Sequence, residues 1–68
     1  MAKMSLKAAR VNAGLTQKGA AAKIGISNKT LHKWETGQSF PNAVKVSAIC
    51  EAYGVEYDDI IFLPDNSL

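Results

Sequence analysis

A short row of polar and basic side chains follows Gly25 and could contact the edges of nucleic-acid bases. The row consists of Ser27, Asn28, Lys29 and Lys33, which face outward from an expected helix. An asparagine amide can pair with N6 and N7 of adenine, and a lysine can donate to O6 and N7 of guanine. The same residues could instead be an ordinary solvated helix face. The elements around the row favour the first interpretation.

Two short helical segments meet at Gly25. Small and aliphatic residues recur at helical spacing before it, and Leu31 and Trp34 lie three positions apart after it. Gly25 suits a left-handed helix end, and Ser27 suits the cap of the next helix. The residues expected to form one apolar seam are Ala20, Ala21, Ile24, Ile26, Leu31 and Trp34. Residues 17–35 therefore predict a helix–turn–helix whose second helix can enter a major groove.

Two further groups of polar residues lie where a duplex backbone would pass. Gln17 and Lys18 stand at the N-terminus of the first helix, where free N–H groups and the helix dipole attract anions. Gln38, Ser39 and Asn42 follow the second helix directly. We expect all five to contact phosphates, with an ordinary loop as the alternative for the last three.

The charges of the chain are divided along its length. All eight basic residues lie at or before Lys45, where Glu35 is the single acidic residue. Residues 46–68 carry five acidic residues and no basic one. This division predicts one face directed at a polyanion and another turned away from it, rather than chance solvation of a helical surface.

Length and composition exclude several classes of protein. The 68 residues suffice for a single domain over residues 1–68, with a core at about 5–62 and frayed ends at 1–4 and 65–68. No apolar run approaches the ~20 residues of a membrane span, and the N-terminus lacks a signal-peptide layout. Cys50 is the only cysteine, which excludes an internal disulfide and a cysteine-based zinc site and fits a reducing cytoplasm.

No group of residues suggests catalysis, a metal or a cofactor. His32 has no candidate partner in the sequence, and Asp58 and Asp59 form an isolated acidic pair. A phosphate or sugar contact and a plain surface position are equally good interpretations of His32. We expect the protein to be no enzyme and to bind no metal, cofactor or small-molecule ligand.

The chain lacks strand-like alternation and predicts an all-α fold of five short helices. Caps, glycines and prolines set their limits. The expected helices are residues 5–13, 17–24, 28–36, 42–53 and 57–62. In the fourth helix the expected buried stripe is Ala43, Val46, Ile49, Cys50 and Tyr53.

These motifs together resemble the Cro/CI-type (XRE) helix–turn–helix domain of phage repressors and their bacterial relatives. The resemblance covers residues 5–62. The matching runs are Leu6-Lys-Ala-Ala-Arg10, Gly14-Leu15-Thr16-Gln17, Ala21-Ala-Lys-Ile24-Gly25-Ile26-Ser27, Leu31-His-Lys-Trp34-Glu35-Thr-Gly37, Pro41 and Ala52-Tyr53-Gly54-Val55.

The resemblance implies a lambda-repressor-like domain that binds double-stranded DNA sequence-specifically. It implies a transcriptional regulator, a repressor, that binds a palindromic operator as a homodimer. Gln17 would hold a phosphate and brace the recognition helix, while Arg10 and Glu35 would form a buried ion pair rather than an exposed one. The alternatives are an antitoxin or restriction-control regulator with a protein partner, and an interaction module of the same fold that does not bind DNA.

The C-terminal third predicts a dimer interface. Its last expected helix carries five large apolar or aromatic residues within seven positions, too many for one short helix to bury. We expect a two-fold contact through Tyr57, Phe62 and Leu63. The alternative is that Phe62 and Leu63 fold back onto the core.

Overall fold

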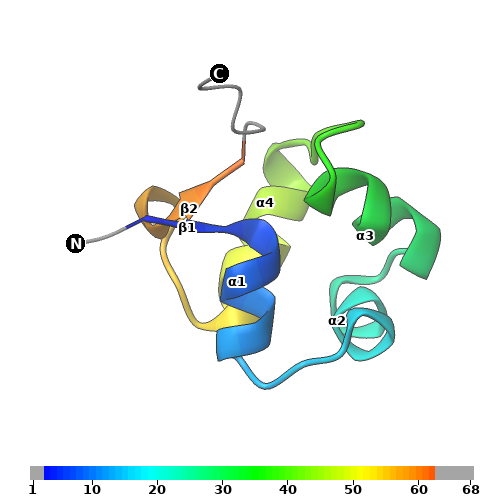
Figure 1. Cartoon of the computed structure of the whole chain (residues 1–68), viewed down its shortest axis with the longest axis horizontal. Coiled ribbons are helices and arrows are strands. Elements are labelled where there is room, and N and C mark those ends of the chain that lie inside the picture. Colours follow the sequence, from blue (N-terminus) through cyan, green and yellow to red (C-terminus); the bar gives the residue numbers. More distant parts are fainter. Residues whose placement is uncertain (1–2, 63–68) are drawn as a thin grey trace.

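Four α-helices form most of the computed structural model, which describes residues 3–62 (Figure 1). They are α1 (Leu6–Asn12), α2 (Gln17–Ile24), α3 (Asn28–Glu35) and α4 (Ala43–Tyr53). A 3₁₀ turn, η1 (Tyr57–Asp59), follows, and two short strands, β1 (Met4–Ser5) and β2 (Ile60–Ile61), lie at the two ends of this region. The four expected α-helices are thus confirmed, with small shifts at their ends.

Side-chain caps set the start of each helix. The side-chain oxygens of Ser5, Thr16, Ser27 and Asn42 each accept the backbone N–H three residues further along, at 2.9–3.1 Å. Each bond satisfies an N–H that has no partner within the helix. Asn42, expected inside the fourth helix, is therefore the residue that caps it.

The core lies where α1, α2, α3 and α4 meet. Leu31 and Ile49 are fully buried at its centre, and Trp34 is 8% exposed. Trp34 is thus a packing residue, because a side chain this buried cannot stack on a base. The other buried apolar residues are Leu6, Ala9, Ala20, Ala21, Ile24, Tyr53 and Ile60.

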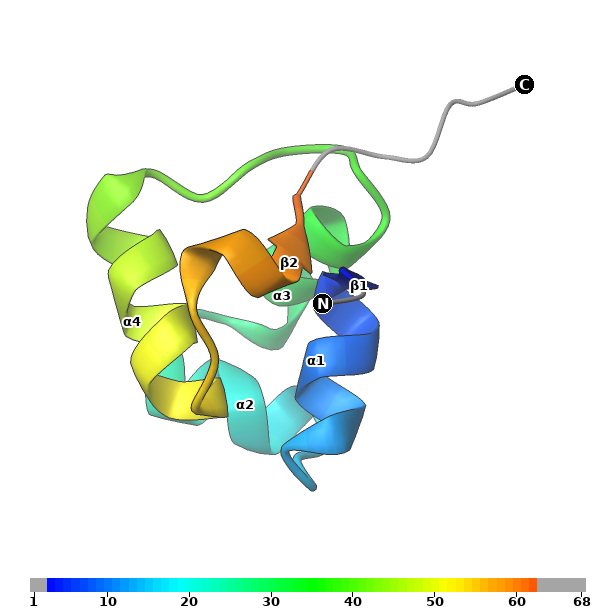
Figure 2. The same ribbon diagram turned by 90° about the vertical axis from the view of Figure 1, so that its left-hand side faces the viewer.

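The expected fifth helix is wrong. The chain makes only one 3₁₀ turn and then extends as β2, which pairs in parallel with β1 (Figure 2). Ile60 lies opposite Met4 and Ile61 opposite Ser5. In an extended chain, successive side chains point to opposite faces, so Ile60 is buried while Ile61 is 47% exposed. Met4, expected within a frayed end, is part of β1; Leu63 and residues 65–68 lie outside the described residues.

The expected buried stripe of α4 is only partly correct. Ile49 and Tyr53 are buried, but Val46 and Cys50 are half-buried and Ala43 is exposed. This side of α4 faces η1, which is too short to cover it. An apolar hollow remains there.

Candidate nucleic-acid interface

The turn between α2 and α3 depends on the left-handed backbone of Gly25. Its φ is +88°, a conformation that costs other residues steric strain. The N–H groups of Gly25 and Ile26 both donate to the carbonyl oxygen of Ala21, at 2.9 and 3.0 Å. Ser27 is extended and caps α3. The chain is thereby redirected within three residues, and α3 crosses α2.

Small residues let α2 and α3 pack closely. Ala20 and Ala21 are 0% and 2% exposed, and they join Leu31 and Trp34 in one buried cluster. Because alanine is short, the two backbones can approach each other without a clash. The apolar side of α3 is buried in this cluster, so its polar side is left at the surface.

The sequence-predicted reading row lies on that exposed side of α3. Asn28, Lys29, His32 and Lys33 are all exposed. Ser27 is exposed too, but its Oγ already accepts the Thr30 N–H at 3.1 Å and lies 2.9 Å from the Thr30 hydroxyl. Ser27 therefore holds the start of the row in place, with limited capacity for further contacts.

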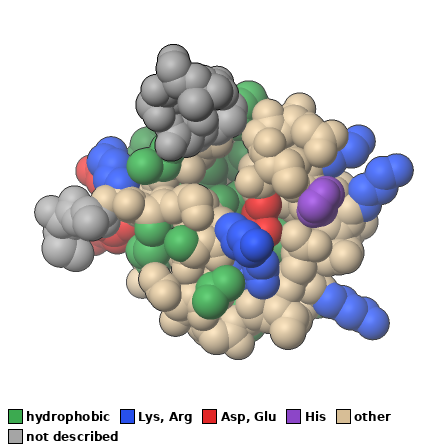
Figure 3. Space-filling model, viewed as in Figure 1, with side chains coloured by type: hydrophobic (Ala, Val, Ile, Leu, Met, Phe, Trp, Pro, Cys, Tyr) green, Lys and Arg blue, Asp and Glu red, His purple; other side chains and the backbone are tan. Residues whose placement is uncertain are grey.

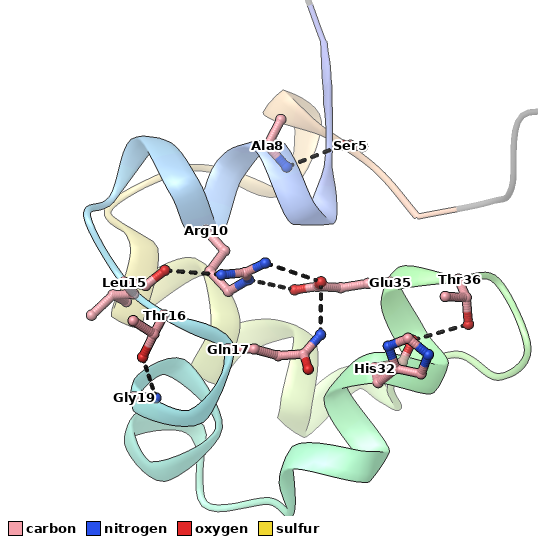
Figure 4. Close-up of polar contacts among 10 residues, drawn as sticks. All are labelled: Ser5, Ala8, Arg10, Leu15, Thr16, Gln17, Gly19, His32, Glu35 and Thr36. Atoms are coloured by element: carbon pink, nitrogen blue, oxygen red, sulfur yellow. Dashed lines mark hydrogen bonds and ion pairs between the residues drawn. The ribbon is translucent and has the colours of Figure 1, made fainter.

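A buried ion pair fixes α3 relative to α1. Arg10 Nε donates to Glu35 Oε2 at 2.7 Å, and Arg10 Nη2 donates to Oε1 at 3.4 Å (Figure 4). The two side chains are only 10% and 4% exposed. Arg10 Nη1 also donates to the Leu15 carbonyl oxygen at 3.0 Å, which ties in the connection to α2. The pair implied by the resemblance is therefore present, and it is buried.

Gln17 connects the same carboxylate to α2. Its Nε2 donates to Glu35 Oε1 at 3.1 Å, so Glu35 receives hydrogen bonds from both α1 and α2 (Figure 4). Gln17 is half-buried at the first position of α2. This bond leaves the amide oxygen and one amide hydrogen of Gln17 for another partner.

Tyr53 lies close enough to this network for the charges of Glu35 and Arg10 to affect its pKa. Burial above all, together with the nearby charge of Glu35, raises the pKa of Tyr53 to about 12, while Arg10 opposes the change. Its hydroxyl is buried and has no hydrogen-bond partner among the described residues. Sequence reasoning assigned Tyr53 to the core but gave no sign of its proximity to the ion pair.

The other expected phosphate-binding residues lie at three places around α3. Lys18 is exposed in the first turn of α2. After α3, the Gln38 side chain donates to the Thr36 hydroxyl at 2.9 Å, and Asn42 uses its Oδ1 to cap α4. Ser39 is half-buried, and its N–H donates to the Lys33 carbonyl oxygen at 3.4 Å.

Charge is divided between the two ends of the molecule. Blue side chains project over α2 and α3 at the right of Figure 3, and most of the red that this view shows lies at the opposite end, near η1, where blue is also present. The exposed acidic residues there include Glu56 and Asp58. The division seen along the sequence is thus partly reproduced in space, with Lys3 at the acidic end beside Tyr57 as an exception.

An apolar face surrounds Tyr57, whose position in the chain is far from the reading row. The Tyr57 ring is 62% exposed and stacks on Phe62, with ring centroids 5.5 Å apart. With Phe40, Pro41 and Val46, the two rings line a hollow of about 290 Å³. Phe62 is half-buried and also packs against the core, as the fold-back alternative requires.

Sequence reasoning missed the part of this face that comes before α4. Phe40 is 51% exposed, although it is a large aromatic residue in a polar loop. That mismatch beside Pro41 was the available signal. A second hollow of about 670 Å³ adjoins the first and is lined by Ala43, Val46, Ser47, Cys50 and Tyr57. Burial raises the pKa of the Cys50 thiol, and Asp59 and Glu56 raise it further.

The fold and this surface define a class of protein, the helix–turn–helix DNA-binding domains. The helix-turn-helix family HTH_3 matches residues 6–60, and the chain belongs to this family, which is of the XRE type and Cro/CI-like. It is accordingly a DNA-binding regulator that acts on double-stranded DNA. A search of curated proteins found no match.

Residues 3–62 contain neither a helix suited to spanning a membrane nor a cluster suited to a metal ion. None of the helices there is long and apolar enough to cross a membrane. No cluster of three or more His, Cys, Asp or Glu residues in that part of the chain could hold a metal ion.

Proposed function

We propose that the protein is a cytoplasmic transcriptional repressor that recognises a specific palindromic operator as a homodimer. The observation that supports this is the exposed row Asn28, Lys29 and Lys33 on a helix held by a buried carboxylate. Base readout needs donors and acceptors whose position is fixed before binding. The hydrogen bonds that Glu35 accepts from Arg10 of α1 and Gln17 of α2 support that fixed position.

In this proposal the polar side chains divide into two roles. Asn28, Lys29 and Lys33 contact base edges, and Ser27 joins them at the start of the row, with its hydroxyl held by Thr30. The phosphate-binding residues are Gln17, Lys18, Gln38, Ser39 and Asn42. Phosphate contacts orient the domain on the duplex, and base contacts give it specificity.

The dependence of affinity on salt tests the phosphate contacts. The logarithm of affinity should fall with the logarithm of salt concentration, with a slope of about −0.9 for each phosphate neutralised. Lys18→Ala removes about one phosphate contact per protomer, so the slope should become shallower by about 0.9 per protomer. Lys23→Ala is the matched control, because Lys23 is exposed on the same helix but at its last turn. A nearly flat salt dependence of the unmodified protein would refute this part of the proposal.

Selection from random duplex DNA tests the reading row. The unmodified protein should select a site with two related halves. Asn28→Ala should lose preference at one base position per half-site, at a cost of about 1–3 kcal/mol. Lys18→Ala is the comparison, since it should weaken binding to all sequences about equally. A consensus unchanged at every position in Asn28→Ala would show that the reading face lies elsewhere.

The homodimer is proposed to form through the apolar face around Tyr57 and Phe62, together with Leu63. This face combines exposed rings with hollows, as a self-complementary contact requires. The dimer would place two recognition helices about one helical turn of DNA apart (~34 Å).

Sedimentation with and without the selected duplex tests this interface. Tyr57→Asp should abolish assembly and cooperative binding, because it places a charge in the contact without disturbing the core. Val11→Asp is the matched control, since Val11 is similarly exposed (57%) on α1. If Tyr57→Asp assembles and binds like Val11→Asp, the dimer does not use this face.

A further inference from the structure

We propose that His32 takes up a proton as the protein binds DNA and that the charged imidazole ring donates a hydrogen bond to a backbone phosphate. This inference rests on the proposed approach of α3 to DNA. It adds His32 as a contact residue and makes the affinity for DNA dependent on pH near neutrality.

The position of His32 on α3 is the first reason. It lies four residues after Asn28 and three after Lys29, which places it beside both on one side of the helix. It is exposed. Its carbonyl oxygen accepts the Thr36 N–H at 3.0 Å and the Thr36 hydroxyl at 3.0 Å (Figure 4). The backbone that carries the ring is therefore fixed, and a ring on this side of α3 comes near the duplex when Asn28 does.

The lack of an anionic partner in the protein is the second reason. Among the described residues, no ion pair or hydrogen bond involves the His32 ring. Glu35 is the only acidic residue of α3, and it is buried and bound to Arg10 and Gln17.

The charged groups of the elements around His32 are mostly basic. On α3 they are Lys29, Lys33 and the buried Glu35, and those of the other helices are Lys7 and Arg10 of α1, Lys18 and Lys23 of α2, and Lys45 and Glu51 of α4. DNA would supply the missing partner, since a duplex carries one negative charge for about every 1.7 Å of its axis. An opposite charge close by favours the charged form of a histidine.

The composition of the chain makes it possible to assign a pH dependence near neutrality to one side chain. His32 is the only histidine, and carboxylates titrate at lower pH than imidazoles as a class. A variant at His32 separates the contribution of this ring from that of any other group.

The test measures affinity for the duplex recovered by selection, between pH 5.5 and pH 8.5 at constant ionic strength. A charged hydrogen bond is about twice as strong as a neutral one, so affinity of the unmodified protein should rise about fivefold per protomer toward pH 5.5. His32→Gln should show a flat profile close to the value at pH 8.5. His32→Lys, which carries its charge throughout, should show a flat profile close to the value at pH 5.5.

Circular dichroism at each pH checks that all three proteins stay folded. A rise of the same size in His32→Gln would overturn the inference, and so would a flat profile in the unmodified protein. In both cases the proposed function would stand, because the protein would still bind the selected duplex. If the unmodified protein bound no duplex at any pH, both proposals would fail.

Discussion

Replacing Glu35 by glutamine removes the charge that the buried guanidinium of Arg10 faces. The glutamine keeps the size of the side chain and one acceptor oxygen, so the change tests charge rather than packing. Arg10 would then remain 90% buried with a neutral partner and the Leu15 carbonyl oxygen. Truncating one member of a buried pair costs about 3–5 kcal/mol because the other charge is left without compensation. Glutamine keeps part of the hydrogen bonding, so we expect a loss of about 3 kcal/mol.

That loss is large for a domain of this size. At about 0.05–0.15 kcal/mol per residue, the 68-residue chain has a free energy of unfolding of about 3–10 kcal/mol. Urea unfolding followed by fluorescence measures the change directly, since Trp34 is the only tryptophan and is 8% exposed. The affinity for DNA should fall as well, because the same bonds set the orientation of α3.

A double-mutant cycle isolates the interaction energy between Arg10 and Glu35 from the contacts that each makes with other residues. Arg10→Met together with Glu35→Leu should lose clearly less stability than the sum of the two single changes, because the double variant strands no charge. Gln17→Ala is the control, since it removes one neutral donor from Glu35 and should cost only about 1 kcal/mol. If Glu35→Gln lost less than 1 kcal/mol and the two changes were additive, the pair would behave as an exposed one.

Three further outcomes follow from single residues. Gly25→Ala should lower the free energy of unfolding by about 1 kcal/mol, because its φ of +88° strains other residues; an unchanged urea midpoint would contradict this. The folded-state pKa of Tyr53 is about 12 and that of an unfolded tyrosine about 10, so its contribution is complete below pH 10 and is lost as the pH rises toward 12. Between pH 8 and pH 11 the free energy of unfolding, measured by urea titration, should therefore fall further in the unmodified protein than in Tyr53→Phe, by about 1 kcal/mol. Burial, Asp59 and Glu56 raise the pKa of Cys50, so iodoacetamide at pH 8 should label it more slowly in the folded protein than in urea, and faster in Glu56→Gln than in the unmodified chain.

Local chemistry explains why the helix–turn–helix could be predicted from the sequence. Thr16 and Ser27 cap helices by bonds that span three residues, and Gly25 is left-handed because of its own backbone freedom. The alternation of apolar and polar positions then decides which side of α3 is buried. Each of these effects acts within one or two turns of helix, so neighbouring residues suffice to reveal it.

Contacts between distant segments were decided by the tertiary structure alone. Met4 pairs with Ile60 because the ends of the domain meet, and this pairing draws Ile60 and Ile61 out of the expected helix. Gln17 reaches Glu35 across 18 positions. The stacking of α1, α2 and α3 brings these groups together, and nothing in their local sequence indicates it.

The exposure of Tyr57 and Phe40 was also set by the way the chain packs. Composition predicted surplus apolar area in the C-terminal third, but not that α4 and η1 would leave hollows beside it. A residue's burial depends on which segments happen to cover it, and this is a property of the whole chain. The sequence by itself therefore determined the helices, their caps and the polar row, and the fold determined how that row is held and which apolar surface is left open.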